Sequence, residues 1–244
     1  FCLSRGLGDV YKRQAFFKGL KEQKFHISQT QITVIGGNLW KQFRVLDLPF
    51  LFESHDHVTK SLDGDVGKKL RDGLSEAVGI KSLAFTYSGG YRIIGSNHAI
   101  NNVDELKNIT LQTVPSTCDM FRKVGANAKR RTKLNIQETK DACFEDGAIE
   151  TTYLRFSGKN ILKTNHSMFL TSILVGNELF DELTPTQQAA WEEAAFIVSK
   201  MERKWSLEDC QEYEDRAKER GITIKDASPD DIRKLRKHSG ASLH

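Results

Sequence analysis

One stretch near the carboxyl end of the sequence limits the fold more than any other. Thr184 followed by Pro185 is typical of the N-cap and first turn of a helix, and no convincing helix breaker follows until Gly221. The residues between them predict one helix of about 36 residues, roughly 54 Å long at about 1.5 Å per residue. Such a helix is longer than a small lobe is wide. It therefore either bridges two lobes or breaks near Trp205-Ser206.

The rest of the chain alternates helical and extended patterns. Helices are predicted at 15–25, after the N-cap Ser54, and at 65–79, 115–126 and 138–147, and strands at 26–35, 80–88, 91–96, 109–114, 148–154 and 167–176. The helix at 65–79 has the apolar stripe of a core-facing helix, formed by Val66, Leu70, Leu74 and Val78. Gly89-Gly90 separates two of the strands. This alternation predicts an α/β fold with largely parallel sheets.

Charge and hydropathy exclude two classes of protein. The net charge of +4 is small and the lysines and arginines are dispersed, so nucleic acid is not an expected partner. The densest basic run, 129–133, is interpreted as a solvated loop or edge strand, with a phosphate-binding patch as the alternative. No stretch approaches the ~20 apolar residues needed to span a bilayer.

The first residues, FCLSRGLGDVYKRQ, have no continuous apolar core of about 7–15 residues and do not make a convincing signal peptide. They resemble a translated sequencing-adapter segment, so 1–14 is interpreted as a non-native segment and left out of the fold prediction. The cysteines beyond it are Cys118, Cys143 and Cys210. Their wide spacing indicates neither a disulfide framework nor a metal motif.

No arrangement of residues indicates catalysis. Nucleophile-elbow, HExxH and P-loop patterns do not occur in the sequence. His55 and His57 are two apart on a predicted helix, so they face different directions, and exposed positions are expected rather than a metal site. Cys118 near a helix start could be an activated thiol, but the sequence offers no partner for it. No cofactor or metal is expected.

Six phrases in a fixed order carry a resemblance to a known family. They are VLDLPFLFES (45–54), LDGDVGKKL (62–70), YSGGYRIIGSNHAINNVDELKN (87–108), KVGAN (123–127), KTNHSMFLTSILVGNELFDELTPTQQAAW (163–191) and ERGITI (219–224). In order and spacing this set resembles the solute-binding proteins of tripartite ATP-independent periplasmic (TRAP) transporters, the DctP-type family. The resemblance covers Ala15 to about Arg236.

The resemblance implies a Venus-flytrap fold, in which two α/β lobes enclose a cleft and the long helix at 184–221 spans both. Lobe 1 then comprises 15–89 and about 168–205, and lobe 2 comprises 90–167 and about 206–244. It also implies that the chain lacks the family's first strand and helix, and that the native N-terminus lies outside it.

The same resemblance implies a protein that is not an enzyme. Such proteins capture a small organic acid or related polar solute in the periplasm and deliver it to membrane permease subunits, without inserting into the membrane. Closure on the ligand would use hinges near Gly89-Gly90 and 167–169. Two other functions stay open: a ligand-sensing subunit of a signalling system, and an enzyme that uses the same cleft.

Two arginines commonly face the ligand in the family, and the resemblance assigns the first to Arg92 in GGYR, with a structural ion pair as its alternative role. Twenty residues later, where the second is expected, the chain has Gln112. An arginine clamps a carboxylate with two parallel charge-assisted hydrogen bonds, whereas glutamine offers a neutral amide. Gln112 is therefore a neutral ligand contact, a strand-end residue with no ligand role, or a sign that Arg155 or Lys140 supplies the charge.

A second departure from the family follows Gly147. Glu150 falls at the position of a family aspartate, and Leu154 at that of an asparagine that helps to hold the ligand. The residues between them, Thr151, Thr152 and Tyr153, lie where a strand should reach the cleft, and with Glu150 they are candidate ligand contacts. Trp40 is a further candidate, as a ring face at the mouth of the cleft, with core packing as the equal alternative. His166 is predicted to be structural.

Overall fold

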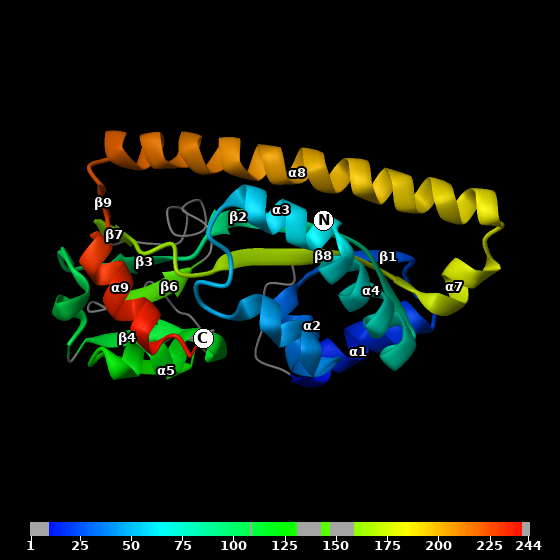
Figure 1. The fold of residues 1–244 in the computed structure, drawn as a ribbon, viewed down its shortest axis with the longest axis horizontal. Coiled ribbons are helices and arrows are strands. Elements are labelled where there is room, and N and C mark those ends of the chain that lie inside the picture. The colour runs from blue at the N-terminus through cyan, green and yellow to red at the C-terminus, as the bar shows by residue number, and fades with distance from the viewer. Residues whose placement is uncertain (1–9, 108, 131–142, 147–158, 241–244) are drawn as a thin grey trace. The chain divides into compact units, whose positions relative to one another are not determined.

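The chain forms two compact units, seen in a computed structural model that describes residues 10–107, 109–130, 143–146 and 159–240 (Figure 1). Unit 1 contains the described residues up to Leu46, together with Phe52–Tyr87 and Leu170–Trp205; unit 2 contains Asp47–Leu51, the described part of Ser88–Phe169, and the chain from Ser206 onward. Four of the described elements continue from one unit into the other, namely the 3-10 helix η1 (Lys41–Asp47), β2 (Ile80–Tyr91), β8 (Met168–Gly176) and α8 (Pro185–Glu219).

Unit 1 contains a three-stranded sheet in the order β1-β8-β2, in which β1 runs antiparallel to β8. Its other described elements are α1 (Val10–Lys21), β1 (Ile27–Gln31), α2 (Ile32–Asn38), the 3-10 helix η1 (Lys41–Asp47), α3 (His55–Asp63), α4 (Asp65–Val78) and α7 (Asn177–Glu182). Part of its core lies where Leu83 of β2 and Val175 of β8 pack with Phe180 of α7 and Ala195 of α8.

The helix boundaries in unit 1 follow their capping residues. The Ser54 hydroxyl accepts a hydrogen bond from the His57 amide at 3.1 Å, which confirms the predicted N-cap of α3. Gly79 ends α4 with φ of +68°, a conformation that favours glycine. Of the predicted apolar stripe on α4, Leu74 is fully buried, whereas Val66 in the first turn is exposed.

The predicted strand at 26–35 is correct only for its first half. β1 ends at Gln31, and α2 begins at Ile32. Ile32 and Ile35 are both fully buried. Residues three apart share a face on a helix but point to opposite sides on a strand, so burial of this pair favours the helix over the alternation seen in the sequence.

Unit 2 contains a six-stranded sheet in the order β5-β4-β6-β3-β7-β9. Its described elements are β3 (Ile93–Ser96), the 3-10 helix η2 (Val103–Leu106), β4 (Thr110–Thr113), α5 (Pro115–Lys123), β5 (Asn127–Arg130), β6 (Cys143–Asp146), β7 (Asn160–Lys163), β9 (Thr223–Asp226) and α9 (Pro229–His238). β4 is parallel to β5 and β6, and β7 is parallel to β9, but β3 is antiparallel to both of its neighbours.

The prediction of largely parallel sheets is therefore wrong, because the sheet of unit 2 is mixed. From the sequence, 138–147 is predicted to be a helix between two strands. Its described residues, Cys143–Asp146, instead form β6, which enters the sheet between β4 and β3. The predicted break at Gly89-Gly90 is also wrong, since β2 continues through both glycines, each with positive φ, to Tyr91.

The two faces of this sheet pack against different helices. On one face Leu111 of β4 and Leu162 of β7 pack with Phe121 of α5 and Leu235 of α9. On the other, Ile93 of β3 packs with residues near the end of α8. The stretch Asp47–Leu51, which the sequence analysis placed in lobe 1, belongs to unit 2, because the Phe50 amide donates to the His166 carbonyl at 2.6 Å and its ring packs on the first of these cores.

The long helix α8 is unbroken over 35 residues, so the alternative of a break near Trp205-Ser206 is excluded. At its start Thr184 and Gln187 form reciprocal side-chain to backbone hydrogen bonds, the capping-box arrangement. At its end Gly221, with φ of +77°, donates to the Lys218 carbonyl, and Ile222 donates to that of Ala217, which together form a Schellman motif. Both ends therefore lie where capping chemistry predicts them.

Candidate functional site: a buried arginine and the crossing segments

Arg92 lies in unit 2, between the last residue of β2 and the first of β3. It is only 4% exposed. Its backbone amide donates to the Ser167 carbonyl at 2.8 Å, and its guanidinium lies 4.4 Å from the centre of the Phe169 ring. A guanidinium over an aromatic face is held there by a cation–π interaction. Burial also raises the pKa of the adjacent Tyr91 phenol.

Gln112 lies on β4, opposite Lys129 of β5 and Phe144 of β6. Its neighbours Leu111 and Thr113 are fully buried. Leu111 belongs to the core that the sheet of unit 2 forms with α5 and α9, called here the α5–α9 core. Because successive strand residues point to opposite faces, Gln112 lies on the other face of the sheet. It is half-buried there. The prediction that Gln112 ends a strand is confirmed, since β4 stops at Thr113 and Pro115 begins α5.

Trp40 belongs to unit 1 and makes the contacts of a packing residue. Its ring centre lies 5.9 Å from that of Phe43. It also covers Gly73 of α4 so closely that a Cβ at that glycine would lie 2.4 Å from the indole. These contacts agree with the packing alternative weighed for Trp40. The remaining predicted contacts, Glu150, Thr151, Thr152 and Tyr153, and the alternative cations Lys140 and Arg155, lie outside the described residues.

A set of contacts that the sequence analysis missed lies where β2 and α8 pass from one unit to the other. In unit 1 the Tyr87 amide donates to the Glu202 carboxylate at 2.7 Å. In unit 2 the Gly89 amide donates to the Ser206 hydroxyl at 2.8 Å, and the Cys210 thiol donates to the Gly89 carbonyl at 2.9 Å. The three α8 side chains are four residues apart, so they share one helix face. That spacing of polar residues on a helix was the available signal.

The backbone that these side chains bind is unusual. Gly89 and Gly90 have φ of +86° and +76°, values that L side chains rarely adopt. Where the backbone has this conformation, α8 side chains satisfy both the amide and the carbonyl of Gly89. The conformation therefore depends on both the glycines and the facing polar side chains.

A second unpredicted polar group lies in the sheet of unit 1. The Gln29 side-chain amide donates to the hydroxyls of Thr86, at 2.8 Å, and Thr171, at 3.0 Å, and the two hydroxyls are 2.5 Å apart. Both threonines are buried. The cluster links all three strands, close to the points at which β2 and β8 leave the unit.

The other candidate residues from the sequence have structural surroundings. Cys118 is buried and its thiol donates to the Ala128 carbonyl, a core position rather than that of an activated thiol. His55 packs against the Tyr87 ring, and burial lowers the pKa of its imidazole. His57 contacts Phe52. His166 is fully buried with its Nδ1 2.7 Å from the Thr164 hydroxyl, which fits its predicted structural role.

Two kinds of feature are absent from the described residues. None of the helices within them combines the length and apolar character that crossing a bilayer requires. In the same part of the chain, no three histidine, cysteine or acidic side chains converge as a metal site. The basic run at 129–133 begins on β5, an edge strand, where Lys129 is exposed, in line with the edge-strand interpretation for that residue.

Solved structures with the same fold are TRAP periplasmic solute-binding proteins. One from Chromohalobacter salexigens, with bound D-glucuronate, has a TM-score of 0.80 and 18% identity, covering 93% of this chain and 77% of its own. One from Pseudomonas aeruginosa, with bound L-malate, has a TM-score of 0.79 and 17% identity, covering 93% of this chain and 81% of its own. One from Haemophilus influenzae, with bound L-gulonate, has a TM-score of 0.80 and 19% identity, covering 93% of this chain and 76% of its own. These matches show that the chain has the α/β fold of those proteins.

The sequence then gives the family. The family model described as bacterial extracellular solute-binding protein, family 7 (DctP), matches residues 7–132 and 148–244. The chain belongs to this family. The match includes part of 1–14, the segment set aside in the sequence analysis.

Two relatives illustrate the extent of the similarity. The 2,3-diketo-L-gulonate-binding periplasmic protein of Escherichia coli is 30% identical over 188 residues, covering 74% of this chain and 57% of that protein. An uncharacterized protein of Haemophilus influenzae is 26% identical over 191 residues, covering 75% and 58%. The chain thus spans a little under three fifths of the length of the curated relatives it matches.

Proposed function

We propose that this chain is part of an extracytoplasmic solute-binding protein that captures a small organic acid for a TRAP-type transporter. Membership of the family supports this. The similar structures hold D-glucuronate, L-malate and L-gulonate, and all three ligands have a carboxylate. We infer that the solute of this protein also has one, and that a sugar acid is the first class to test.

The observation that carries the proposal is the buried Arg92. A guanidinium binds a carboxylate best when its plane is fixed in advance, because less side-chain entropy is then lost on binding. The Phe169 ring supports the face of the Arg92 guanidinium, and the Ser167 carbonyl accepts a hydrogen bond from the Arg92 backbone amide. Arg92 is therefore proposed to receive the ligand carboxylate in a bidentate arrangement.

Gln112 is proposed as a neutral contact to the remainder of the ligand. Its amide can donate to and accept from a hydroxyl, and it lies on the face of the sheet opposite the α5–α9 core. A sugar acid has hydroxyl groups that would use both functions. Two alternatives for Gln112 stay open, a strand-end position without a ligand role, and a carboxylate held by Arg155 or Lys140.

Ligand binding is proposed to shift the population between two conformations by virtue of different affinities for them. The segments that would change are those at which the chain crosses between units, around Gly89-Gly90 in β2 and at 167–169 at the start of β8. A radius of gyration from small-angle scattering that ligand leaves unchanged would count against this step.

Delivery to membrane permease subunits in the periplasm is the proposed physiological role. A ligand-sensing role with a signalling partner would use the same binding chemistry, and the genes beside this one distinguish the two: permease genes favour transport, and a kinase gene favours sensing. An enzyme is the third candidate, and incubation of each binding ligand with the protein, followed by product analysis, tests it.

The direct experiment is thermal stabilisation by a panel of dicarboxylates, sugar acids and neutral sugars. A ligand at a hundredfold excess over its Kd stabilises the protein by about 2.7 kcal/mol. We expect stabilisation by at least one acid, its loss in Arg92→Ala, and weakening in Arg92→Lys, which keeps the charge without the bidentate geometry. Arg233→Ala is the matched control, because Arg233 is an exposed arginine of the same unit. Stabilisation by neutral sugars alone would refute the proposed carboxylate site.

A further inference from the structure

One side of α8 carries an apolar stripe that is exposed to solvent. Ile197 and Val198 are each 49% exposed, Met201 is 43% exposed and Trp205 is 52% exposed. At about 100° per residue, these side chains fall within an arc of roughly 100° on the helix. Two small residues, Ala190 and Ala194, continue the stripe toward the start of the helix and are exposed as well.

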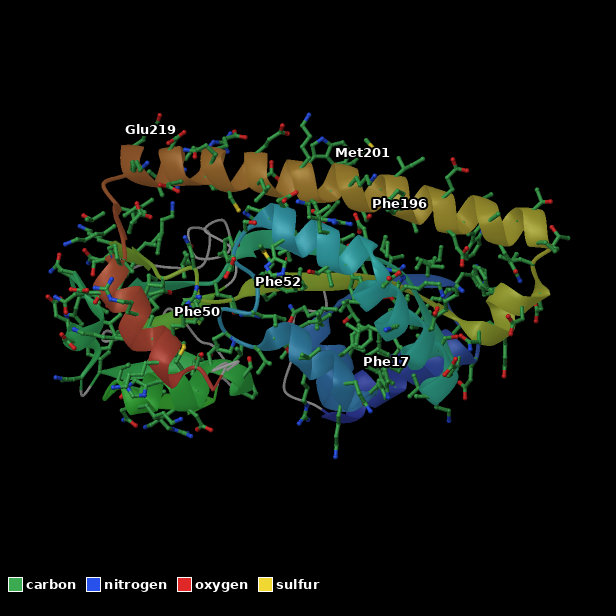
Figure 2. The ribbon with its side chains drawn as sticks, viewed as in Figure 1. Phe17, Phe50, Phe52, Phe196, Met201 and Glu219 are labelled. Carbon is green, nitrogen blue, oxygen red and sulfur yellow. The ribbon has the colours of Figure 1, made fainter. Side chains whose placement is uncertain are left out.

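The stripe lies on the side of α8 opposite its buried face. That face is formed by Ala195, Ser199, Arg203 and Ser206, all of which are buried. Arg203 binds Asp63 and Thr59 of α3, which fixes the orientation of the helix on unit 1. In Figure 2 the Met201 side chain accordingly projects from the side of α8 away from α3. The whole stripe belongs to unit 1.

Spacing and size distinguish this stripe from scattered surface residues. Ala190, Ala194, Ile197 and Met201 follow one another at intervals of four, three and four residues, the spacing of a helix-to-helix seam. The segment from Ala190 to Trp205 is about 24 Å long. Contiguous exposed apolar surface of this kind indicates an interaction surface.

We propose that this stripe packs against the same stripe of a second copy of the chain, with the two α8 helices antiparallel about a two-fold axis between Ile197 and Met201. In this register Ile197 of each copy faces Met201 of the other. A residue of one copy and a residue of the other lie at the same height along the helix axes when their numbers sum to about 398. Trp205 of one copy therefore lies over the small Ala194 of the other. A large side chain opposite a small one permits close approach of the helices.

The charges beside the stripe fit the same register. Glu193, Lys200 and Lys204 lie along one edge of the stripe, and all three are exposed. A two-fold axis perpendicular to the helices places this edge against the same edge of the partner copy. Glu193 of each copy then lies at the height of Lys204 of the other, which gives two pairs of opposite charge, whereas the two Lys200 side chains form one pair of like charge near the axis. Edge pairs of this kind set the partner and orientation of antiparallel helices.

The charges also argue against a membrane as the occupant. Surface-bound helices have lysine and arginine on the polar face, next to an apolar face that enters the lipid. Here Lys200 and Lys204 lie at one edge of the stripe, but exposed Glu208 and Glu212 lie in line with the stripe itself, and Glu193 lies at its edge. Anionic lipid would repel these carboxylates, whereas a second copy provides cations opposite one of them.

Sedimentation velocity over a range of concentrations tests the proposal on the 244-residue chain. We expect a reversible dimer, and a monomer in Met201→Glu. Val66→Glu is the matched control, because Val66 is an exposed apolar residue of another helix in the same unit; it should dimerise as the wild type does. A thermal unfolding curve for each variant shows that it is folded.

A charge-exchange cycle tests the register. Glu193→Lys and Lys204→Glu should each raise the dimer Kd about tenfold, since each places like charges in two contacts per dimer. The double variant restores opposite charges and should return the Kd to within about threefold of the wild type. A monomer at every concentration, dimerisation that survives Met201→Glu, or a double variant no better than the singles would each overturn the proposal. None of these measurements depends on the solute, so their failure is separate from failure of the proposed function.

Discussion

Asp231 is expected to be one of the main polar anchors of unit 2. Its carboxylate accepts hydrogen bonds from the Val103 amide at 2.8 Å, the Ser228 amide at 3.0 Å and the Ser228 hydroxyl at 2.6 Å. The residue is 2% exposed, and Val103 is fully buried. These bonds fix α9 at its first turn and attach it to η2, so they support the core face of the sheet that contains Gln112.

The substitution Asp231→Ala should destabilise the protein by about 2–4 kcal/mol. The largest part comes from the buried Val103 amide, which loses its acceptor at a cost of about 1–3 kcal/mol. Ser228 is exposed and can bind water, so the loss of its two bonds adds less. The matched control is Asp230→Ala in the same helical turn, because Asp230 is exposed and pairs with exposed Arg233; it should cost less than about 1 kcal/mol.

Urea unfolding of the two variants at pH 7 measures the difference directly. Burial alone would raise the pKa of the Asp231 carboxyl, but the hydrogen bonds from Ser228 and Val103 outweigh it and keep the pKa below its usual 3.8. The stabilisation is therefore fully present above pH 3.8 and is lost as the pH falls through the lower folded-state pKa. The difference in the free energy of unfolding between the wild type and Asp231→Ala should be constant from pH 7 to about 5 and should become smaller in stronger acid. Equal losses for Asp231→Ala and Asp230→Ala would refute this reasoning.

Three further predictions concern other parts of the chain. Gly90→Ala and Gly79→Ala should each cost about 1–2 kcal/mol in urea unfolding, because both positions have positive φ and a Cβ at Gly90 comes no closer than 3.6 Å to another atom; a much larger loss at Gly90 would indicate a clash instead. Arg203→Ala should cost roughly 3 kcal/mol, since it leaves the half-buried Asp63 carboxylate without the guanidinium 2.5 Å away, and a loss below about 1 kcal/mol would contradict this. Cys143 should resist iodoacetamide at pH 8 until the protein is unfolded, because burial raises the pKa of its thiol to about 12; mass spectrometry detects the adduct, and rapid labelling of the folded protein would contradict the prediction.

The sequence was a good guide wherever a local chemical signal determines the structure. The ends of α8 at Thr184 and Gly221, and the N-cap Ser54, follow from hydrogen bonding within a few residues, so they are visible without the fold. The strand at Gln112 follows from alternation and Pro115 in the same way.

The predictions were wrong where contacts with residues far apart in the sequence determine the local structure. Residues 32–35 alternate like a strand, yet burial of Ile32 and Ile35 against the core of unit 1 makes them helical. Cys143–Asp146 form a strand because β4 and β3 supply hydrogen-bonding partners on both sides, which no local pattern reveals. The contacts of Glu202, Ser206 and Cys210 with β2 join segments more than 100 residues apart, so only the four-residue spacing was available in advance.

The candidate site was only partly predictable from the residues themselves. Arg92 and Gln112 were assigned by resemblance to the family, and periodicity alone would have given a strand-end glutamine and one arginine among many. Burial of Arg92 against the Phe169 ring is information that the structure adds. It follows from packing between the start of β3 and the start of β8, which are about 75 residues apart in the sequence.

The most direct test of the central claim is a calorimetric titration of the chain with D-glucuronate and, under identical conditions, with D-glucose. The two solutes share a ring and most hydroxyl groups, but only the first has a carboxylate. The account predicts heat of binding for an acid of this class, no detectable binding of the neutral sugar, and loss of the acid signal in Arg92→Ala but not in Arg233→Ala. Equal binding of acid and sugar, or acid binding that is unchanged in Arg92→Ala, would contradict it.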